Sequence, residues 1–159
     1  MENILIRKIE EKDIVETAIV FAKAFNFADR EEGWTKETAT KYIKYWLDRR
    51  LDMFFVAIKN KEIVGGMVGD IKPFKDKTVL TEIVLFVSPK YHKLGIAKKL
   101  VEYVVKEAVK KYNVSEVNSI ANSAIDFPMG WYNRIGLKKT KWVFIEGRAE
   151  EILKNLGVE

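Results

Sequence analysis

The residues best suited to chemistry lie where an apolar stretch meets a lysine-rich amphipathic one. Residues 82–87 (EIVLFV) predict a strand, which Pro89 ends because proline has no N–H to donate. Apolar residues then recur at helical spacing, so residues 90–94 lead into the start of a helix. N–H groups there have no intrahelical partner, and an anion bound to them also meets the positive end of the helix dipole. Gly95 and Ala97 lack bulk, which allows a ligand close to the main chain. The alternative is an ordinary turn that binds nothing.

This junction resembles the pyrophosphate-binding segment of the GNAT superfamily of acetyl-CoA-dependent N-acetyltransferases. That family has a Val-x-Pro strand end, a short loop, and then Gln or Arg, two residues, Gly, one residue, and Gly or Ala. Val87 and Pro89 match the strand end, and Gly95 and Ala97 match the loop. His92 stands at the Gln/Arg position and departs from the pattern.

The resemblance implies that acetyl-CoA binds here as a cosubstrate, with its pyrophosphate on the loop. It also implies that the strand pairs with the pantetheine arm, and that an N–H near Val87 stabilises the developing oxyanion. A fully paired central strand, and an exposed His92 that binds nothing, are the alternatives. The implied cofactor-binding residues are Leu85, Phe86, Val87, His92, Lys93, Leu94, Gly95, Ile96, Ala97 and Asn122. Asn122 is about three residues further from the next tyrosine than is usual in the family.

Residues 131–137 (WYNRIGL) resemble the second motif of the family, in which a tyrosine precedes a Gly-Phe pair by four residues. Tyr132 and Gly136 match, while Leu137 replaces the phenylalanine. The resemblance implies that Tyr132 protonates the leaving thiolate. A phenol with a pKa near about 10 suits a thiolate with a pKa near about 8.5. The alternative is an aromatic core residue beside Trp131.

The best candidate for the base that deprotonates an amine nucleophile is Glu82. Strand alternation places it on the same face as Val84 and Phe86, so we expect it to be buried. Two alternatives exist. Glu82 is only a charged residue at the start of a strand, or a chain of water molecules carries the proton to solvent in place of Glu82. Four aromatic residues are candidates for the walls of an acceptor site, although they are more often core: Trp34, Tyr42, Tyr45 and Trp46.

Length and composition narrow the class of protein. A chain of 159 residues with 48% hydrophobic residues indicates one globular domain over residues 1–159. Cysteine is absent and His92 is the only histidine, which argues against disulfides and against a metal site. The sequence shows neither a signal peptide nor an apolar run long enough to span a bilayer, so we expect a cytoplasmic protein. A net charge of +5 favours an anionic partner such as CoA.

Periodicity predicts an α+β fold, and the order of its elements matches the GNAT family. The resemblance implies an α/β/α sandwich with a mixed, mostly antiparallel sheet of about six strands, splayed at the cofactor site and flanked by about four helices. Expected strands cover 3–9, 53–58, 63–71, the stretch ending at 87, 116–121 and 141–145. Expected helices begin at Asp13 and after Thr35, and cover 94–112, 126–135 and 149–156. The family usually ends in a further strand, whereas residues 148–159 favour a helix.

The sequence therefore predicts an N-acetyltransferase that moves an acetyl group from acetyl-CoA to a primary amine by direct attack in a ternary complex. The alternative is a catalytically inactive acyl-CoA-binding regulatory domain. A nucleic-acid-binding domain is not expected, because no aromatic–basic RNA motif or zinc signature is present. The acceptor is not revealed by the sequence. Neither is the oligomeric state, for which a homodimer is one option.

Overall fold

The computed structural model describes residues 3–124 and 126–157. The chain divides into two compact units, the first ending at Ser119 and the second beginning at Ile120. The first unit holds the sheet and the three long helices, whereas the second holds two short helices.

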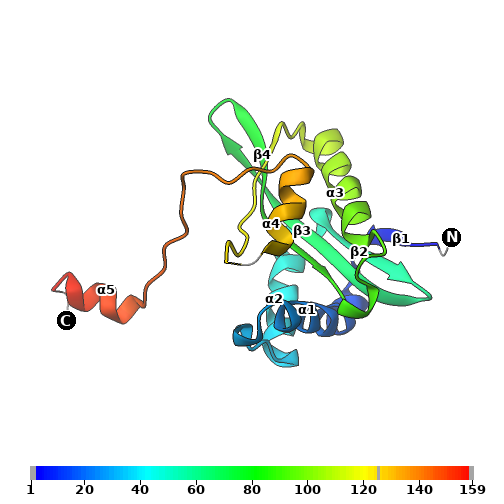
Figure 1. The fold of residues 1–159 in the computed structure, drawn as a ribbon, viewed down its shortest axis with the longest axis horizontal. Helices are drawn as coiled ribbons and strands as arrows, with labels where there is room; N and C mark the ends of the chain where they lie inside the picture. The colour runs from blue at the N-terminus through cyan, green and yellow to red at the C-terminus, as the bar shows by residue number, and fades with distance from the viewer. Residues whose placement is uncertain (1–2, 125, 158–159) are drawn as a thin grey trace. The chain divides into compact units, whose positions relative to one another are not determined.

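A five-stranded sheet with its strands in chain order forms the centre of the first unit (Figure 1). The antiparallel neighbours are β1 (Leu5–Lys8), β2 (Phe54–Lys59), β3 (Glu62–Phe74) and β4 (Lys77–Val87). The last strand, β5 (Glu116–Val117), runs parallel to β4. The predicted mixed, mostly antiparallel sheet is confirmed, with five strands among the residues that the structure describes.

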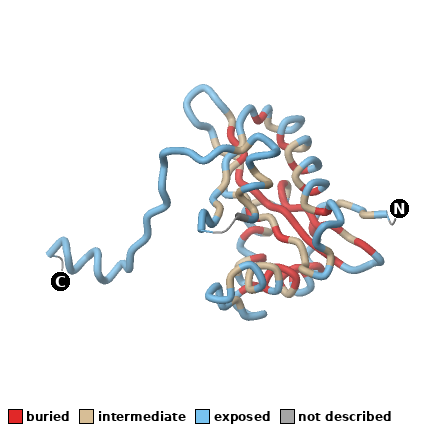
Figure 2. Tube along the Cα trace, in the orientation of Figure 1, coloured by how far each residue is buried: buried red, intermediate tan, exposed pale blue. Residues whose placement is uncertain are grey.

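Helices cover both faces of this sheet, which gives the predicted α/β/α layers. Helices α1 (Ile14–Ala28) and α2 (Lys36–Arg50) pack on one face, and α3 (Ile96–Tyr112) packs on the other. Two cores result, because side chains alternate across the pleat. The first core includes Phe21, Ile43, Val68 and Phe86, and the second includes Met67, Leu80, Leu100 and Val104. Figure 2 shows the strands of the first unit as the most deeply buried segments.

Local signals set the bounds of α2, and its start after Thr35 was predicted from the sequence. The Thr35 hydroxyl accepts the N–H of Thr38 at 3.1 Å and caps the helix start. The helix ends at Arg50, next to Arg49, whose guanidinium donates to buried Asp70 on β3 at 2.5 Å. Cations suit this end because of the helix dipole.

A bulge interrupts the pairing of β3 and β4. The pair Val68–Val84 is followed by Asp70–Thr81, so β4 carries two residues where β3 carries one. Glu82 lies in this bulge with a φ of 51°, in the left-handed region that side chains other than glycine rarely adopt. The extra residue shifts the alternation of inward and outward side chains along β4.

The pairing of β4 with β5 is short. The prediction of a strand over residues 116–121 holds only for Glu116–Val117, and the Asn118 N–H makes one further bond to the Leu80 carbonyl at 2.9 Å. The ladder pairs of β5 with β4 end at Leu80–Val117, whereas β4 continues to Val87. The second half of β4 therefore extends past this parallel ladder.

The second unit contains α4 (Asp126–Arg134) and α5 (Ala149–Asn155). Gly136, with a φ of 103°, follows the last turn of α4 as predicted. The terminal helix predicted over residues 149–156 is confirmed by α5.

The strand predicted over residues 141–145 is wrong. These residues have no regular secondary structure, and the side chains of Trp142, Val143, Phe144 and Ile145 are all strongly exposed. The prediction rested on their high β-propensity, which measures how well a residue fits a pleated, half-buried surface. A lone stretch does not become a strand without a neighbour to pair with, and none pairs with it among the described residues.

Candidate functional site

The loop that connects β4 to α3 forms a tight backbone turn. Pro89–Tyr91 make a 3-10 turn, and Lys93 and Gly95 follow with φ values of 63° and 75°. A Cβ at Gly95 would meet no atom within 4 Å, so glycine serves the left-handed backbone here and leaves open space beside it.

The N-terminus of α3 is free of side-chain caps. Gly95 is the N-cap residue, none of the described side chains accepts a hydrogen bond from the first turn, and that turn contains no acidic residue. Ile96 anchors the helix start in the core and is 1% exposed. The first N–H groups of a helix need an acceptor, so this turn suits an oxygen-rich anion.

The second half of β4 presents backbone groups on its open edge. The Ser88 N–H donates to the Val64 carbonyl at 2.8 Å, which makes these two residues a hydrogen-bonded pair. Because such pairs alternate with non-hydrogen-bonded ones, Val87 opposite Gly65 must point its N–H and carbonyl away from β3. By the same alternation, Leu85 does so too. These groups can pair with an extended ligand.

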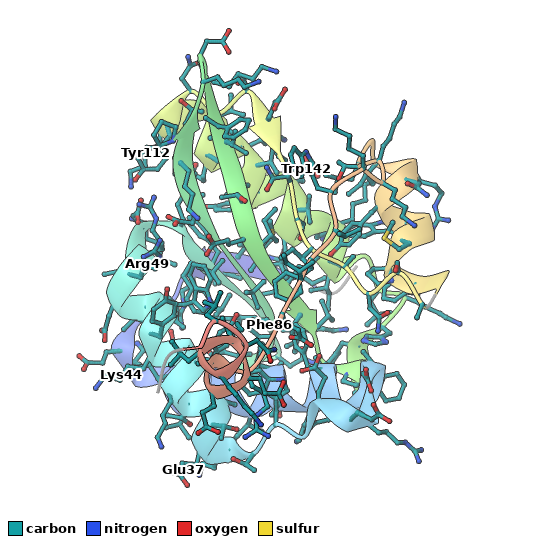
Figure 3. All side chains as sticks on the ribbon, turned by 90° about the vertical axis from the view of Figure 1, so that its left-hand side faces the viewer. Glu37, Lys44, Arg49, Phe86, Tyr112 and Trp142 are labelled. Atoms are coloured by element: carbon teal, nitrogen blue, oxygen red, sulfur yellow. The ribbon has the colours of Figure 1, made fainter. Side chains whose placement is uncertain are left out.

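Phe86 lies between these two residues and points toward the layer of α1 and α2 (labelled in Figure 3). It is 2% exposed, and its ring meets Phe21 at 5.5 Å between centroids in a T-shaped contact. Val84 and Phe86 are both buried and lie in the same core, so they share the face on which alternation placed them. Phe86 therefore fixes the strand, while its neighbours offer the backbone groups.

His92 does not extend freely from the loop. Its Nε2 lies 3.0 Å from the Val87 carbonyl oxygen, and its ring makes a T-shaped contact with Phe27 of α1 at 5.7 Å between centroids. Lys93 and Leu94 are exposed beside it. Sequence reasoning did not single out Phe27, and the available signal was an aromatic residue near the end of α1, outside its apolar stripe.

The predicted burial of Glu82 is wrong. Its side chain is 43% exposed, and its carboxylate is bound by Lys72 of β3. The bulge is the physical reason, because it breaks the alternation that would have placed Glu82 on the face of Val84 and Phe86. Lys72 also lies 4.0 Å from Asp70, so Glu82 belongs to a charged cluster at the surface.

Tyr132 and Asn122 belong to the second unit. Burial raises the pKa of the Tyr132 phenol, and its ring lies 5.3 Å from the Trp131 ring. The Asn122 side-chain oxygen accepts the Ala124 N–H at 2.9 Å and so closes a local turn. Leu85, Val87, His92, Lys93 and the start of α3 are thus brought together in the first unit, and the roles of Tyr132 and Asn122 remain predictions.

The aromatic residues proposed as acceptor-site walls divide into two groups. Trp46 is 3% exposed and lies in the core of α1 and α2, as the alternative predicted. Trp34 and Tyr42 pack against the same core with 5.2 Å between their ring centroids. Tyr45 is half exposed and is the best remaining candidate for a wall.

The described residues hold no group of three or more His, Cys, Asp or Glu side chains placed to bind a metal ion. None of the helices in residues 3–124 and 126–157 combines the length and the apolarity needed to cross a membrane.

Several solved structures share this fold. An aminoglycoside N-acetyltransferase in complex with CoA has a TM-score of 0.71 and 16% identity, with 94% of this chain and 97% of that chain covered. The PaiA N-acetyltransferase from Thermoplasma acidophilum, in complex with coenzyme A, has a TM-score of 0.66 and 19% identity over 89% and 93%. A protein from Clostridium acetobutylicum that is described as a predicted acetyltransferase, with acetyl-CoA, has a TM-score of 0.67 and 18% identity over 91% and 96%.

A search of curated proteins returns no match to this sequence. The model of the acetyltransferase (GNAT) family matches residues 20–129, well over half of the chain. The chain therefore belongs to the GNAT acetyltransferase family.

Proposed function

We propose that this protein is an N-acetyltransferase that moves an acetyl group from acetyl-CoA to a primary amine by direct attack in a ternary complex. Membership of the family supports the acetyl donor, and three structural neighbours were solved with CoA or acetyl-CoA. The observation that carries the proposal is the junction of β4 and α3, where an open strand edge runs directly into an uncapped helix start.

The residues at this junction fit acetyl-CoA. The first N–H groups of α3 suit the pyrophosphate, and the open space at Gly95 allows it close to the main chain. Lys93 adds a cation beside the same loop. The outward backbone groups of Leu85 and Val87 suit the amides of the pantetheine arm, in the manner of an added strand. Leu94, Ile96 and Ala97 would contact the cofactor through their backbone, and Asn122 is the proposed further contact.

When bound, acetyl-CoA supplies an activated acetyl group on a thiol leaving group. The Val87 N–H would donate to the carbonyl oxygen as negative charge develops on it, an effect often worth about 3–4 kcal/mol. Tyr132 would donate its phenolic proton to the departing sulfur. The phenol is protonated at neutral pH, because its ordinary pKa of 10.0 is raised by burial and not lowered, so it has a proton to donate.

Glu82 is the proposed acceptor of the proton that the amine loses. Its exposed side chain gives the carboxylate direct contact with solvent, so a proton taken from the amine can leave through water. The acceptor amine would approach along the half-exposed Tyr45 of α2.

The test compares two variants of one residue. Gly95→Glu and Gly95→Lys impose the same left-handed backbone strain, but they place opposite charges beside the helix start. If the pyrophosphate binds there, we expect Gly95→Glu to abolish CoA binding in calorimetry and Gly95→Lys to weaken it less. Gly157→Glu is the matched control, because Gly157 also has a positive φ, of 72°, and open space around it.

Equal CoA affinity in both Gly95 variants and the unaltered protein would place the site elsewhere. The enzyme activity itself is tested on a panel of amines, polyamines and peptide N-termini, with detection of the free thiol. Tight CoA binding without transfer to any acceptor would support the alternative, an inactive acyl-CoA-binding regulatory domain.

A further inference from the structure

The one histidine of the chain occupies the strand edge that a bound pantetheine arm would need. His92 Nε2 lies 3.0 Å from the Val87 carbonyl oxygen. That carbonyl points away from β3, since Val87 and Gly65 form a non-hydrogen-bonded pair. The imidazole therefore sits on the open edge of β4 and not against its paired edge.

The imidazole competes with a bound ligand for space on this edge as well as for the hydrogen bond. A backbone paired with a strand lies about 4.8 Å from it. The His92 imidazole, whose Nε2 is 3.0 Å from the Val87 carbonyl oxygen, therefore occupies the space that such a backbone would need next to Val87. A ligand that adds to the edge as a strand must therefore take the place of the ring.

Phe27 holds the imidazole from its other side. The two rings meet edge to face at 80°, with 5.7 Å between centroids. Phe27 is itself 67% exposed. The loop end of α1 thus supports the position of His92 on the strand edge.

We propose that His92 closes the open edge of β4 in the unliganded protein and leaves the Val87 carbonyl when the pantetheine arm pairs with it. This inference rests on the proposed function, because it assumes that CoA binds at β4. The histidine then acts as a latch that competes with the cofactor and not as a phosphate ligand. The apparent affinity for CoA is the affinity of the open form multiplied by the fraction of molecules whose strand edge is open. Removal of the latch raises this fraction and so strengthens CoA binding.

The two roles of His92 predict opposite results for His92→Ala. If the latch contributes the free energy of one hydrogen bond, His92→Ala should bind CoA about two- to ten-fold more tightly than the unaltered protein. The affinity for 3′,5′-ADP, which carries phosphates but no pantetheine, should not change. Calorimetry with both ligands measures the two effects on one protein.

Phe27→Ala provides a second variant that leaves the imidazole in place. Loss of the supporting ring should also tighten CoA binding, by a smaller factor than His92→Ala. Phe74→Ala is the matched control, because Phe74 is similarly exposed, at 61%, but lies at the turn between β3 and β4. It should leave both affinities unchanged.

The unaltered protein offers a measurement that does not depend on any variant. Because the chain has one histidine, a nitrogen-15 spectrum contains a single pair of imidazole signals. We expect them to shift when CoA is added and to stay in place when 3′,5′-ADP is added.

Weaker binding of both ligands by His92→Ala would overturn the latch and make His92 a phosphate ligand. Unchanged affinities, or imidazole signals that do not respond to CoA, would overturn it as well. Failure of the proposed function is a separate result, because the unaltered protein would then bind no CoA at all.

Discussion

Tyr132 carries a phenol that is protonated across the neutral range, since its ordinary pKa of 10.0 is raised further by burial. Tyr132→Phe removes one oxygen and keeps the ring beside Trp131. We expect kcat to fall by about 10²-fold or more, the usual scale of general acid catalysis, while KM for acetyl-CoA hardly changes. Steady-state kinetics with an acceptor from the amine panel measures both.

A structural role of Tyr132 would give a different pattern. Loss of packing would lower the melting temperature and would weaken binding and rate together. Trp131→Phe changes the adjacent ring without touching the phenol, and is therefore a suitable control for packing in α4. An unchanged rate in Tyr132→Phe would mean that the thiolate leaves without help from this residue.

At the scale of the secondary structure elements, β3 and β4 approach each other closely because β3 has glycine opposite the open-edge residues. A Cβ on Gly65 would lie 2.7 Å from the Phe86 carbonyl oxygen and 3.3 Å from the Val87 Cα. Both are backbone atoms, which cannot rotate away as a flexible side chain can.

Gly65→Ala should therefore destabilise the first unit by about 1–3 kcal/mol, the range found for overpacked interiors. Urea unfolding followed by circular dichroism measures the free energy. Gly130→Ala is the control, because its Cβ would meet only the end of the Arg134 side chain, at 3.9 Å, on a helix where alanine is favoured. It should not lower the free energy of unfolding, and an equal loss in both variants would contradict the close approach.

Sequence periodicity predicted the elements where local signals determine them. Thr35 and Arg49 mark the ends of α2, and Gly136 marks the end of α4, because caps depend on a few neighbouring residues. The loop at Gly95 was predicted for the same reason.

The errors concern features that depend on a partner far along the chain. The exposure of Glu82 follows from a bulge, and that bulge exists only in the register between β3 and β4. The irregular structure of residues 141–145 reflects the absence of a described partner strand. The contact of His92 with Val87 depends on how the loop folds back, which residue types alone do not specify.

At the scale of the whole molecule, stability depends on pH through buried carboxylates that hold the first unit together. Asp13 accepts two hydrogen bonds from Arg7, at 2.6 and 3.0 Å, and one from the Glu10 N–H at 2.8 Å. The bond from Arg7 is the main reason that the pKa of Asp13 lies below its ordinary value of 3.8, despite the opposing effect of burial.

A carboxyl group whose pKa is lower in the folded state stabilises that state when it is ionised. The contribution of Asp13 is therefore present above about pH 4 and is lost as the pH falls through the folded value. We expect Asp13→Asn to lower the free energy of unfolding at pH 7, and the difference from the unaltered protein to shrink on acidification below pH 4. Urea unfolding at a series of pH values measures this.

Asp48→Asn, a change of an exposed carboxylate on α2, is the control and should have little effect at any pH. A destabilisation of Asp13→Asn that is equally large at pH 3 and pH 7 would mean that the loss arises from packing and not from the ion pair.

The exposed apolar stretch Trp142–Ile145 affects how copies of the chain associate in solution. Four adjacent β-prone side chains open to solvent form the kind of short segment that stacks with copies of itself. Lys138, Lys139 and Lys141 precede this stretch directly, and like charges brought into register repel one another. The lysines thus oppose self-association of the apolar stretch. This effect weakens as ionic strength rises, because salt shortens the range of the repulsion. The interaction that keeps copies of the chain apart is therefore electrostatic repulsion, although the segment next to these lysines is apolar and strongly exposed.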